Sequence, residues 1–327
     1  MLKRILIGLL FILVALPVSG SAYQQVSLMQ DNQTYPPPGE LIDIGGYSLH
    51  IHCIGEGEPT LIIDTGAADW SVSWMAIQPD LAQLTRTCIY DRAGLGWSEA
   101  SPEPRTSQQL VNELHTLLNN ANIEPPYILL GHSLGGYNVR IYQEQYPDEV
   151  AGIILADSAH PGQWDVLPPE VENLVSQQVG LLNNMSMLTN FGVVRLILPE
   201  HAYLSEDWQD AYSSHMARSR HLLASAGELA GGIGLSAEQA AETGDSGDLP
   251  LVVVTAGRSF DAFRAMTDDI PFDEAEATWQ ELQRDLATLS SNSVHLVSPD
   301  AHHTIQLTDP DIVIEAVETM LGMLMDE

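Results

Sequence analysis

Residues 127–137 read Tyr-Ile-Leu-Leu-Gly-His-Ser-Leu-Gly-Gly-Tyr. The apolar run at 128–130 is typical of a strand buried on both faces, and apolar residues recur at helical spacing after it. Between the two, Gly131, Ser133 and Gly135 have the G-x-S-x-G spacing of a strand that turns sharply into a helix. Glycine at both flanks removes the side chains that such a turn would bring into collision. The sequence therefore predicts an exposed serine at the carboxyl end of a strand, beside a helix N-terminus.

Composition sets the scale of the molecule and excludes some partners. The chain has 327 residues and is 45% hydrophobic, which is enough for a large core. It has 44 acidic against 12 basic residues, a formal net charge of -32. We therefore expect no binding to nucleic acid or to anionic membrane surfaces, and we interpret the charge as a solubility surface.

The amino terminus predicts export. Lys3 and Arg4 precede an uncharged apolar run at 5–16, and small residues follow up to Ala22. This is the pattern of a signal peptide over 1–22, cleaved near Ala22 and leaving no membrane span. An uncleaved membrane anchor is the alternative, since 5–22 is at the lower length limit for a span. Residues 23–40 are predicted to be a polar leader outside the core.

Strand and helix patterns alternate through most of the remaining chain. This alternation predicts an α/β fold with a mostly parallel sheet flanked by helices, built from 41–160 and 246–327. The pattern changes at 161–245, where several helical stretches occur without a clear strand. We interpret 161–245 as a helical cap inserted between two strands of the sheet.

Four stretches together resemble the α/β-hydrolase family. They are Asp64-Thr-Gly66, Asp91-Arg-Ala-Gly-Leu-Gly-Trp-Ser98, the glycine-flanked serine at 131–136, and His303 in the loop after the last predicted strand. The resemblance extends from residue 41 to the end and implies an esterase-like or lipase-like serine hydrolase with a helical cap. It is specific for fold and much less specific for substrate.

A serine hydroxyl needs a base to take its proton, and neutral imidazole does so near neutral pH. The family's chain order places this base late, where the sequence has His295, His302 and His303. His295 lies inside a predicted strand and is interpreted as structural. Both others lie in the loop that returns toward Ser133; His303 matches the family's histidine loop in register and is the predicted base, with His302 as the alternative. His132 beside the serine is interpreted as structural or solvated.

The resemblance leaves two places for the acid that orients the imidazole. Asp157 ends the strand after the serine helix, and Asp261 lies on a looser loop after the next strand. An acid that fixes the tautomer and orientation of the ring needs a rigid position. We therefore predict Asp157 as the acid and keep Asp261 as the alternative.

The resemblance also implies an oxyanion hole, formed by the backbone N–H groups of Ala67 and Leu134. The family usually has histidine where this chain has Thr65, so the support of this loop is an open question. Ser133 itself indicates acyl transfer to water, because family members that open epoxides or displace halide use aspartate at that position. No cofactor is expected, and no histidine has metal-ligand spacing of the H-E-x-x-H type.

Two further expectations concern the cap and the cysteines. Apolar cap residues are candidates for an acyl pocket, with packing of the cap as an equal alternative: Leu181, Leu182, Met185, Met187, Leu188, Phe191, Val193 and Val194. The only cysteines, Cys53 and Cys88, fall on the second and fourth predicted strands, which are neighbours in this fold. An exported chain with this arrangement is expected to form one disulfide, with two buried thiols as the alternative.

The sequence therefore predicts an exported serine hydrolase that cleaves carboxylic esters, with a small molecule as its acyl substrate. Hydrolysis of amides, lactones or thioesters, or transfer to an acceptor other than water, is an alternative chemistry. A non-catalytic binding protein of the same fold is the alternative class. Acyl length, leaving group and oligomeric state are not specified by these residues.

Overall fold

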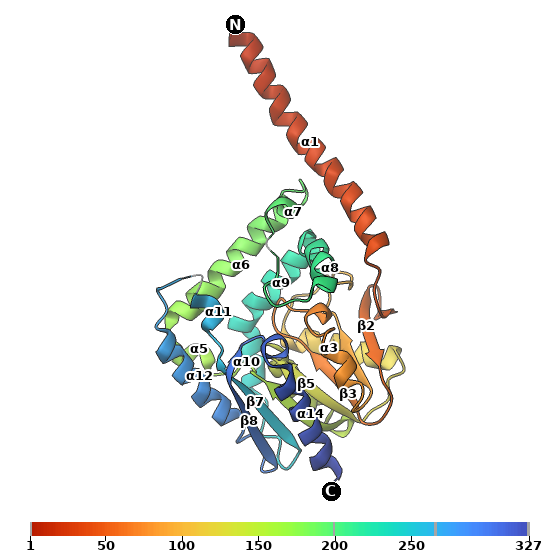
Figure 1. Ribbon diagram of the computed structural model, residues 1–327, viewed down its shortest axis with the longest axis vertical. Helices are drawn as coiled ribbons and strands as arrows, with labels where there is room; N and C mark the ends of the chain where they lie inside the picture. The colour runs from red at the N-terminus through yellow and green to blue at the C-terminus, as the bar shows by residue number, and fades with distance from the viewer. Residues whose placement is uncertain (1, 199, 265–266, 326–327) are drawn as a thin grey trace.

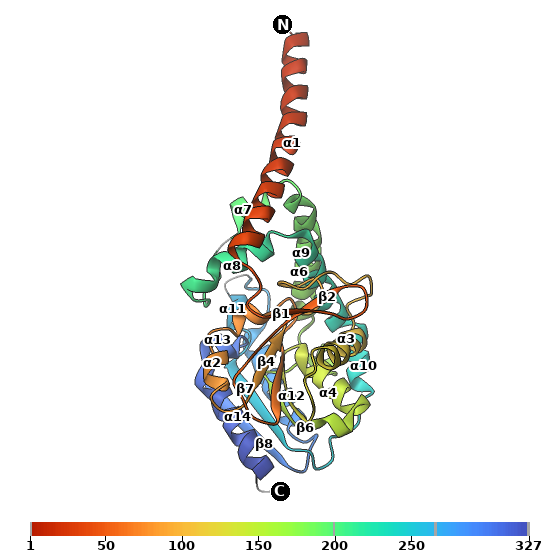
Figure 2. The ribbon, with the colours of Figure 1, turned by 90° about the vertical axis from the view of Figure 1, so that its right-hand side faces the viewer.

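A twisted sheet forms the centre of the protein (Figures 1 and 2). The computed structural model describes residues 2–198, 200–264 and 267–325. The strand order is β1-β2-β4-β3-β5-β6-β7-β8. Strand β2 pairs antiparallel with β1 and β4, and the other pairs are parallel, which confirms the predicted α/β class. The strands are β1 (Glu40–Asp43), β2 (Ser48–Ile54), β3 (Thr60–Asp64), β4 (Thr87–Tyr90), β5 (Tyr127–His132), β6 (Val150–Ala156), β7 (Leu251–Arg258) and β8 (Ser293–His302).

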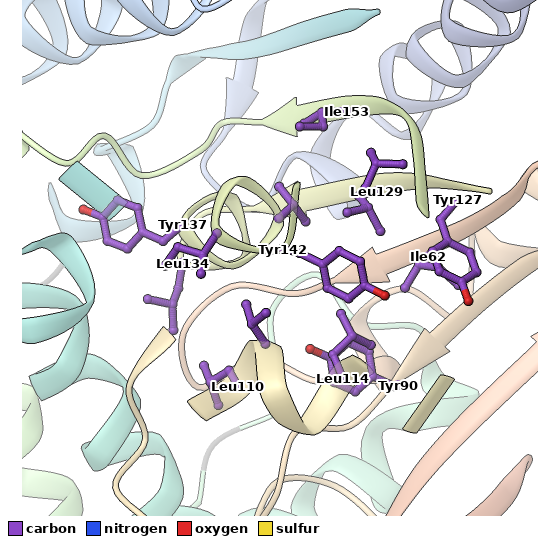
Figure 3. Packing of buried hydrophobic residues seen from close by; sticks show 14 of the residues in the cluster. Ile62, Tyr90, Leu110, Leu114, Tyr127, Leu129, Leu134, Tyr137, Tyr142 and Ile153 are labelled. Atoms are coloured by element: carbon purple, nitrogen blue, oxygen red, sulfur yellow. The ribbon is translucent and has the colours of Figure 1, made fainter. Parts of the chain in front are cut away.

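Helices cover both faces of the sheet because alternate residues of its central strands point to opposite sides. One face packs against α3 (Ser107–Asn120) and α4 (Gly135–Gln145), as Figure 3 shows for Leu110, Tyr142 and Leu129. The other face packs against α2 (Gln78–Leu81) and α14 (Pro310–Met325). Near-continuous apolar strands are what a sheet buried on both sides requires. The carboxyl ends of the strands remain for the site, since Ser133, Asp157 and His303 directly follow β5, β6 and β8.

A helical insertion, defined here as residues 161–245, comes between β6 and β7 in the chain, and its helices lie above the sheet in Figure 1. Its long helices α6 and α9 pack against each other. The helices are α5 (Gln163–Val166), α6 (Pro169–Thr189), α7 (Val194–Ile197), α8 (Glu206–Met216), α9 (Ser219–Ile233) and α10 (Leu235–Ala241). After the insertion come α11 (Asp261–Arg264), α12 (Phe272–Leu286) and α13 (Ile305–Thr308). Short 3-10 turns occur at η1 (Ser71–Ser73) and η2 (Pro147–Glu149).

The amino terminus forms one long helix, α1 (Leu2–Thr34), that projects from the body (Figures 1 and 2). Residues 23–34, predicted as a leader outside the core, are helical and contact the insertion. Gln24 is buried and donates to the carbonyl of Ala217 at 2.8 Å, and Arg195 pairs with Asp31 at 2.6 Å. These long-range partners tie the segment to the insertion, and the composition of the segment gives no sign of them. Within the described residues, no helix combines the length and hydropathy needed to cross a bilayer.

Cys53 and Cys88 form a disulfide, as expected. The two residues lie directly opposite each other on the antiparallel strands β2 and β4. Their Cα atoms are 4.0 Å apart, so the strand register itself brings the sulfurs together. The bond joins the antiparallel β1–β2 hairpin to the parallel part of the sheet.

Candidate active site

Ser133 occupies the turn between β5 and α4 with a backbone φ of 50°, in the left-handed region. Its glycine neighbours permit that turn. A Cβ on Gly131 would lie 2.5 Å from the carbonyl oxygen of Gly135, and one on Gly135 would lie 2.2 Å from that of Asp64. Real Cβ atoms do not approach so closely, so both positions exclude a side chain. The local sequence therefore builds the turn that presents the serine.

His303 directly follows β8, the last strand, and its side chain contacts Ser133. Its Nε2 lies 2.9 Å from the Oγ of Ser133, and its Nδ1 lies 2.7 Å from Oδ2 of Asp157. The imidazole side chain is 28% exposed, whereas Asp157 is fully buried. The three side chains thus form one continuous hydrogen-bonded chain from the interior to the serine hydroxyl.

Asp157 is held rigidly at the end of β6. Its Oδ1 accepts hydrogen bonds from the backbone N–H of Ala256 at 3.0 Å and from the indole N–H of Trp279 at 2.9 Å. The hydroxyl of Ser259 donates to Oδ2 at 2.8 Å. His303 contacts the same oxygen, and the Ser259 hydroxyl also lies 3.1 Å from Oδ1, so three groups surround Oδ1 and two surround Oδ2. Together Ala256, Trp279, Ser259 and His303 hold the carboxylate in one orientation.

Asp261, the alternative acid, has arginine partners in place of His303. It pairs with Arg258 and Arg264 near the start of α11. Burial alone would raise the pKa of Asp261, but hydrogen bonding from Arg264 and the charges of Arg258 and Arg264 together outweigh burial and lower this pKa. The structure therefore brings Asp157 to the imidazole and assigns Asp261 to a surface ion pair.

The other candidate histidines have separate partners. His302 faces Tyr203 of the insertion, with Nδ1 3.2 Å from the phenol oxygen. His295 lies in β8, with Nε2 2.7 Å from the hydroxyl of Thr255. Both arrangements are structural, as predicted for His295, and neither ring contacts Ser133.

His132 supports the loop that carries His303. It is buried, and its Nε2 lies 2.7 Å from the backbone carbonyl oxygen of His303, so this nitrogen carries the proton and donates. Burial, followed by the neighbouring His303 charge, lowers the pKa of His132 to about 3. A neutral ring therefore fixes the backbone at His303, the predicted base, over the whole physiological pH range.

The loop expected to hold the oxyanion lies close to the serine turn. A Cβ on Gly66 would lie 3.2 Å from the Cβ of Ser133, so this glycine permits close packing of the two segments. Ala67 and Leu134, the predicted donors, both line the cavity that contains Ser133 and His303. The two backbone segments therefore converge on the same space beside the serine.

Arg92 supports this loop in place of the missing histidine. Its guanidinium donates to the backbone carbonyls of Thr65 at 2.8 Å and Gly66 at 2.5 Å. It also pairs with Asp64 at 2.6 Å and with Glu228 of α9 at 2.8 Å. Burial opposes the charge of Arg92, but these two carboxylates outweigh it and raise its pKa. The motif at 91–98 contains Arg92, but the sequence alone does not indicate this role.

Glu228 connects the insertion to the same loop. One oxygen accepts from Nε of Arg92 and the other from its Nη2 at 2.8 Å and from the N–H of Ala68 at 3.0 Å. Ala68 has a positive φ of 62°, which this bond helps to hold. No motif marked Glu228 in the sequence, because its partners lie more than a hundred residues away.

A cavity of about 250 Å³ lies over the serine and is lined mainly by apolar side chains. The insertion contributes Trp164, Leu167, Val171, Leu174 and Val175, and α12 contributes Trp279. The insertion lines the cavity with α5, the first half of α6 and, through Leu229 and Gly232, α9. The residues expected to form an acyl pocket, at 181–194, do not line it; they lie farther along α6 and beyond. The apolar pattern of α6 is continuous, so the sequence did not reveal which half faces the serine.

Comparisons with known proteins agree with this architecture. A family model described as alpha/beta hydrolase fold matches residues 59–310. The uncharacterized protein YqjL of Bacillus subtilis (strain 168) is 24% identical over 277 residues, which cover 84% of this chain and 88% of YqjL. The uncharacterized protein YbdG of the same organism is 25% identical over 165 residues, 50% of this chain, and the match spans about half (51%) of YbdG.

Solved structures show the same fold. A thermophilic esterase from Thermogutta terrifontis is 21% identical, with a TM-score of 0.56, over 87% of this chain and 98% of the esterase. The epoxide hydrolase CorEH is 17% identical, with a TM-score of 0.65, over 86% of this chain and 98% of CorEH. At these identities the likeness concerns the fold alone. With the family model covering most of the chain, the protein belongs to the alpha/beta hydrolase fold family.

Proposed function

We propose that this hydrolase-fold protein is a serine hydrolase that cleaves carboxylic esters. The observation that carries the proposal is the hydrogen-bonded chain from Asp157 through His303 to Ser133. A neutral imidazole at 2.9 Å can take the serine proton as the hydroxyl attacks an acyl carbon. The resulting imidazolium is stabilised by the carboxylate of Asp157, which also fixes Nδ1 as the protonated nitrogen.

The remaining steps follow from the same groups. The N–H groups of Ala67 and Leu134 would stabilise the negative oxygen of the tetrahedral intermediate, each by about 3 kcal/mol. His303 then gives its proton to the leaving alcohol, and the acyl group stays on Ser133. Water, deprotonated by the same imidazole, releases the acid and restores the serine. We propose that the helical insertion acts as the cap that excludes bulk water from this chemistry.

Two features narrow the proposal to esters of small apolar acids. Serine, rather than aspartate, at position 133 supports acyl transfer over the epoxide hydrolysis for which the structural neighbour CorEH is named. The cavity, at about 250 Å³, is below the usual range of about 300–1,000 Å³ for ligand pockets and is mainly apolar. We expect p-nitrophenyl butyrate to be cleaved faster than the laurate ester. Amides, lactones and thioesters are the alternative acyl substrates.

The amino-terminal pattern supports an exported protein. We propose that residues 1–22 direct export and that cleavage occurs near Ala22, with retention of the segment as an anchor as the alternative. The disulfide between Cys53 and Cys88 fits an oxidising compartment. Mass spectrometry of the amino terminus of the protein recovered outside the cytoplasm decides between cleavage and retention.

A fluorophosphonate probe tests the catalytic proposal, because it reacts covalently only with an activated serine. We expect labelling of the wild type and of the exposed-serine control Ser291→Ala, and no labelling of Ser133→Ala. If the folded wild type stays unlabelled and cleaves no ester, the proposal is wrong and the non-catalytic binding role takes its place. Labelling without hydrolysis would instead favour transfer to an acceptor other than water.

A further inference from the structure

The far end of the insertion exposes many large apolar side chains. We define the insertion tip as the second half of α6, α7 and the loop between them, residues 181–198. Six of its large apolar side chains have exposed fractions from 41% to 75%: Leu181, Met187, Leu188, Phe191, Leu196 and Ile197. Contiguous exposed apolar surface of this kind marks an interaction site. Because the tip does not line the cavity over Ser133, the proposed chemistry does not account for it.

Helix α1 leaves the body at this same tip, beside α7 (Figures 1 and 2). A Cβ on Gly20 would lie 2.4 Å from the backbone carbonyl oxygen of Phe191, so the two backbones are in direct contact. Arg195 of α7 donates to the side chain of Gln24 at 2.8 Å. Leu16 and Val18, just before this contact, are 68% and 64% exposed. The apolar surface of the tip therefore continues onto α1.

The charge distribution identifies the kind of partner. The chain has a net charge of -32, yet residues 5–30 and 173–194 contain no Asp, Glu, Lys or Arg. The two segments meet where Gly20 and Tyr23 of α1 contact Phe191 and Gly192 of the tip. Arg195, which follows the second segment, is paired with Asp31 at 2.6 Å. The tip is thus the part of an acidic protein that can approach the apolar interior of a bilayer without bringing unpaired charge into it.

The apolar stripe of α6 connects this surface with the cavity. Val171, Leu174 and Gln178 line the cavity, and Leu181, Met185 and Leu188 continue the same three-and-four spacing toward the tip. One face of a single helix therefore runs from the serine cavity to the exposed tip. A second copy of the chain would cover the apolar area equally well, but in the chain that keeps its amino terminus it would not explain why the apolar segment 5–16 leads away from the body at the same place.

We propose that the insertion tip, together with the adjoining part of α1, docks onto the surface of a phospholipid bilayer, with α7 in the apolar boundary. This interfacial mode buries apolar side chains a few ångströms below the headgroups. The patch persists if residues 1–22 are removed, since all of 181–198 remains. The proposal does not depend on esterase activity, because its readout is binding.

Site-specific labelling tests where the membrane contacts the protein. Both native cysteines are in the disulfide, so Leu196→Cys provides a single reactive thiol in the full-length chain. Val297→Cys is the matched control; Val297 is 48% exposed and belongs to β8, a strand that Figure 1 shows well away from α7. The thiol carries a nitrobenzoxadiazole label. At position 196 we expect its fluorescence to rise on addition of phosphatidylcholine vesicles and to be quenched when those vesicles contain spin-labelled lipid. At position 297 we expect neither change.

Binding measurements give the magnitude. Removing two exposed apolar side chains in L196Q/I197Q should weaken vesicle binding about 100-fold, or about tenfold for each side chain. V297Q, the folded control, should bind like the wild type. Absence of vesicle binding, or a vesicle-bound chain with position 196 unquenched, overturns the proposal. Label at position 196 that is shielded in lipid-free dimers, and that vesicles do not release, would assign the tip to a second copy and also overturn it.

Discussion

Asp157→Asn tests the triad, because the geometry allows the amide of the new side chain only one orientation. Oδ1 accepts from two N–H donors that cannot reverse, the backbone of Ala256 and the indole of Trp279. The new amide must therefore keep its oxygen on that side and turn its NH₂ toward His303. Two N–H donors cannot face each other, so the imidazole shifts its proton to Nε2. That nitrogen is then unable to accept the proton of Ser133.

The expected loss is large and confined to catalysis. A triad carboxylate replaced by asparagine, with geometry intact and the wrong tautomer, lowers kcat by about 10⁴ in a well-studied serine protease. We expect a comparable fall in kcat for Asp157→Asn, and little change in KM for a p-nitrophenyl ester. The hydroxyl of Ser259, which donates to Asp157 at 2.8 Å, can accept from the new NH₂, so the fold should be retained.

Asp261→Asn is the matched control. It changes the same functional group at the alternative position, where Asp261 pairs with Arg258 and Arg264. We expect a change in kcat of less than about threefold, as for an exposed ion pair. Both variants should show wild-type circular dichroism. A larger loss for Asp261→Asn, or an Asp157→Asn enzyme within tenfold of wild type, would refute the assignment of the acid.

Three further predictions concern support of the site and stability. Glu228→Gln leaves the buried charge of Arg92 with one carboxylate fewer; we expect a loss of about 3 kcal/mol in unfolding free energy by urea titration, and a kcat at least tenfold lower because the oxyanion loop loosens. Unchanged values for both would remove this role. Reduction of the Cys53–Cys88 disulfide, which closes a separation of 35 residues, should cost about 4 kcal/mol in the same assay, and an unchanged midpoint would contradict the estimate. Burial lowers the pKa of His221 to about 3, so between about pH 6.5 and 3 the unfolded chain binds a proton there that the folded chain does not. Stability should therefore fall with decreasing pH by up to about 1.4 kcal/mol per unit from this residue, and His221→Gln should flatten that dependence; equal slopes for the two proteins would exclude the contribution.

The sequence was most informative where structure follows from neighbouring residues. The turn at Ser133 was predictable because Gly131 and Gly135 have a steric reason within five residues. The disulfide was predictable once strand order was inferred from the family resemblance. The rigid position of Asp157 also followed, because it ends a strand without an intervening loop.

Features that depend on distant partners were not predictable. Glu228 acts on Arg92 across 136 positions of sequence, and nothing local distinguishes it from other acidic residues on helices. The cavity-lining half of α6 was misplaced because apolar spacing is the same along the whole helix. The contacts of residues 23–34 with the insertion were not foreseen, because a polar side chain such as Gln24 gives the same sequence pattern whether it bonds to water or to protein.

The link between Glu228 and the oxyanion loop has a consequence for evolution and engineering. The insertion leaves and re-enters the sheet at β6 and β7, which are adjacent, so its removal would not disturb the strand pairing. In that sense it resembles an interchangeable module. The core offers Arg92 one countercharge, Asp64, and α9 supplies the second, so a transplanted or shortened module must bring its own acid for Arg92. Grafting experiments that ignore this requirement should yield folded chimeras with poor turnover.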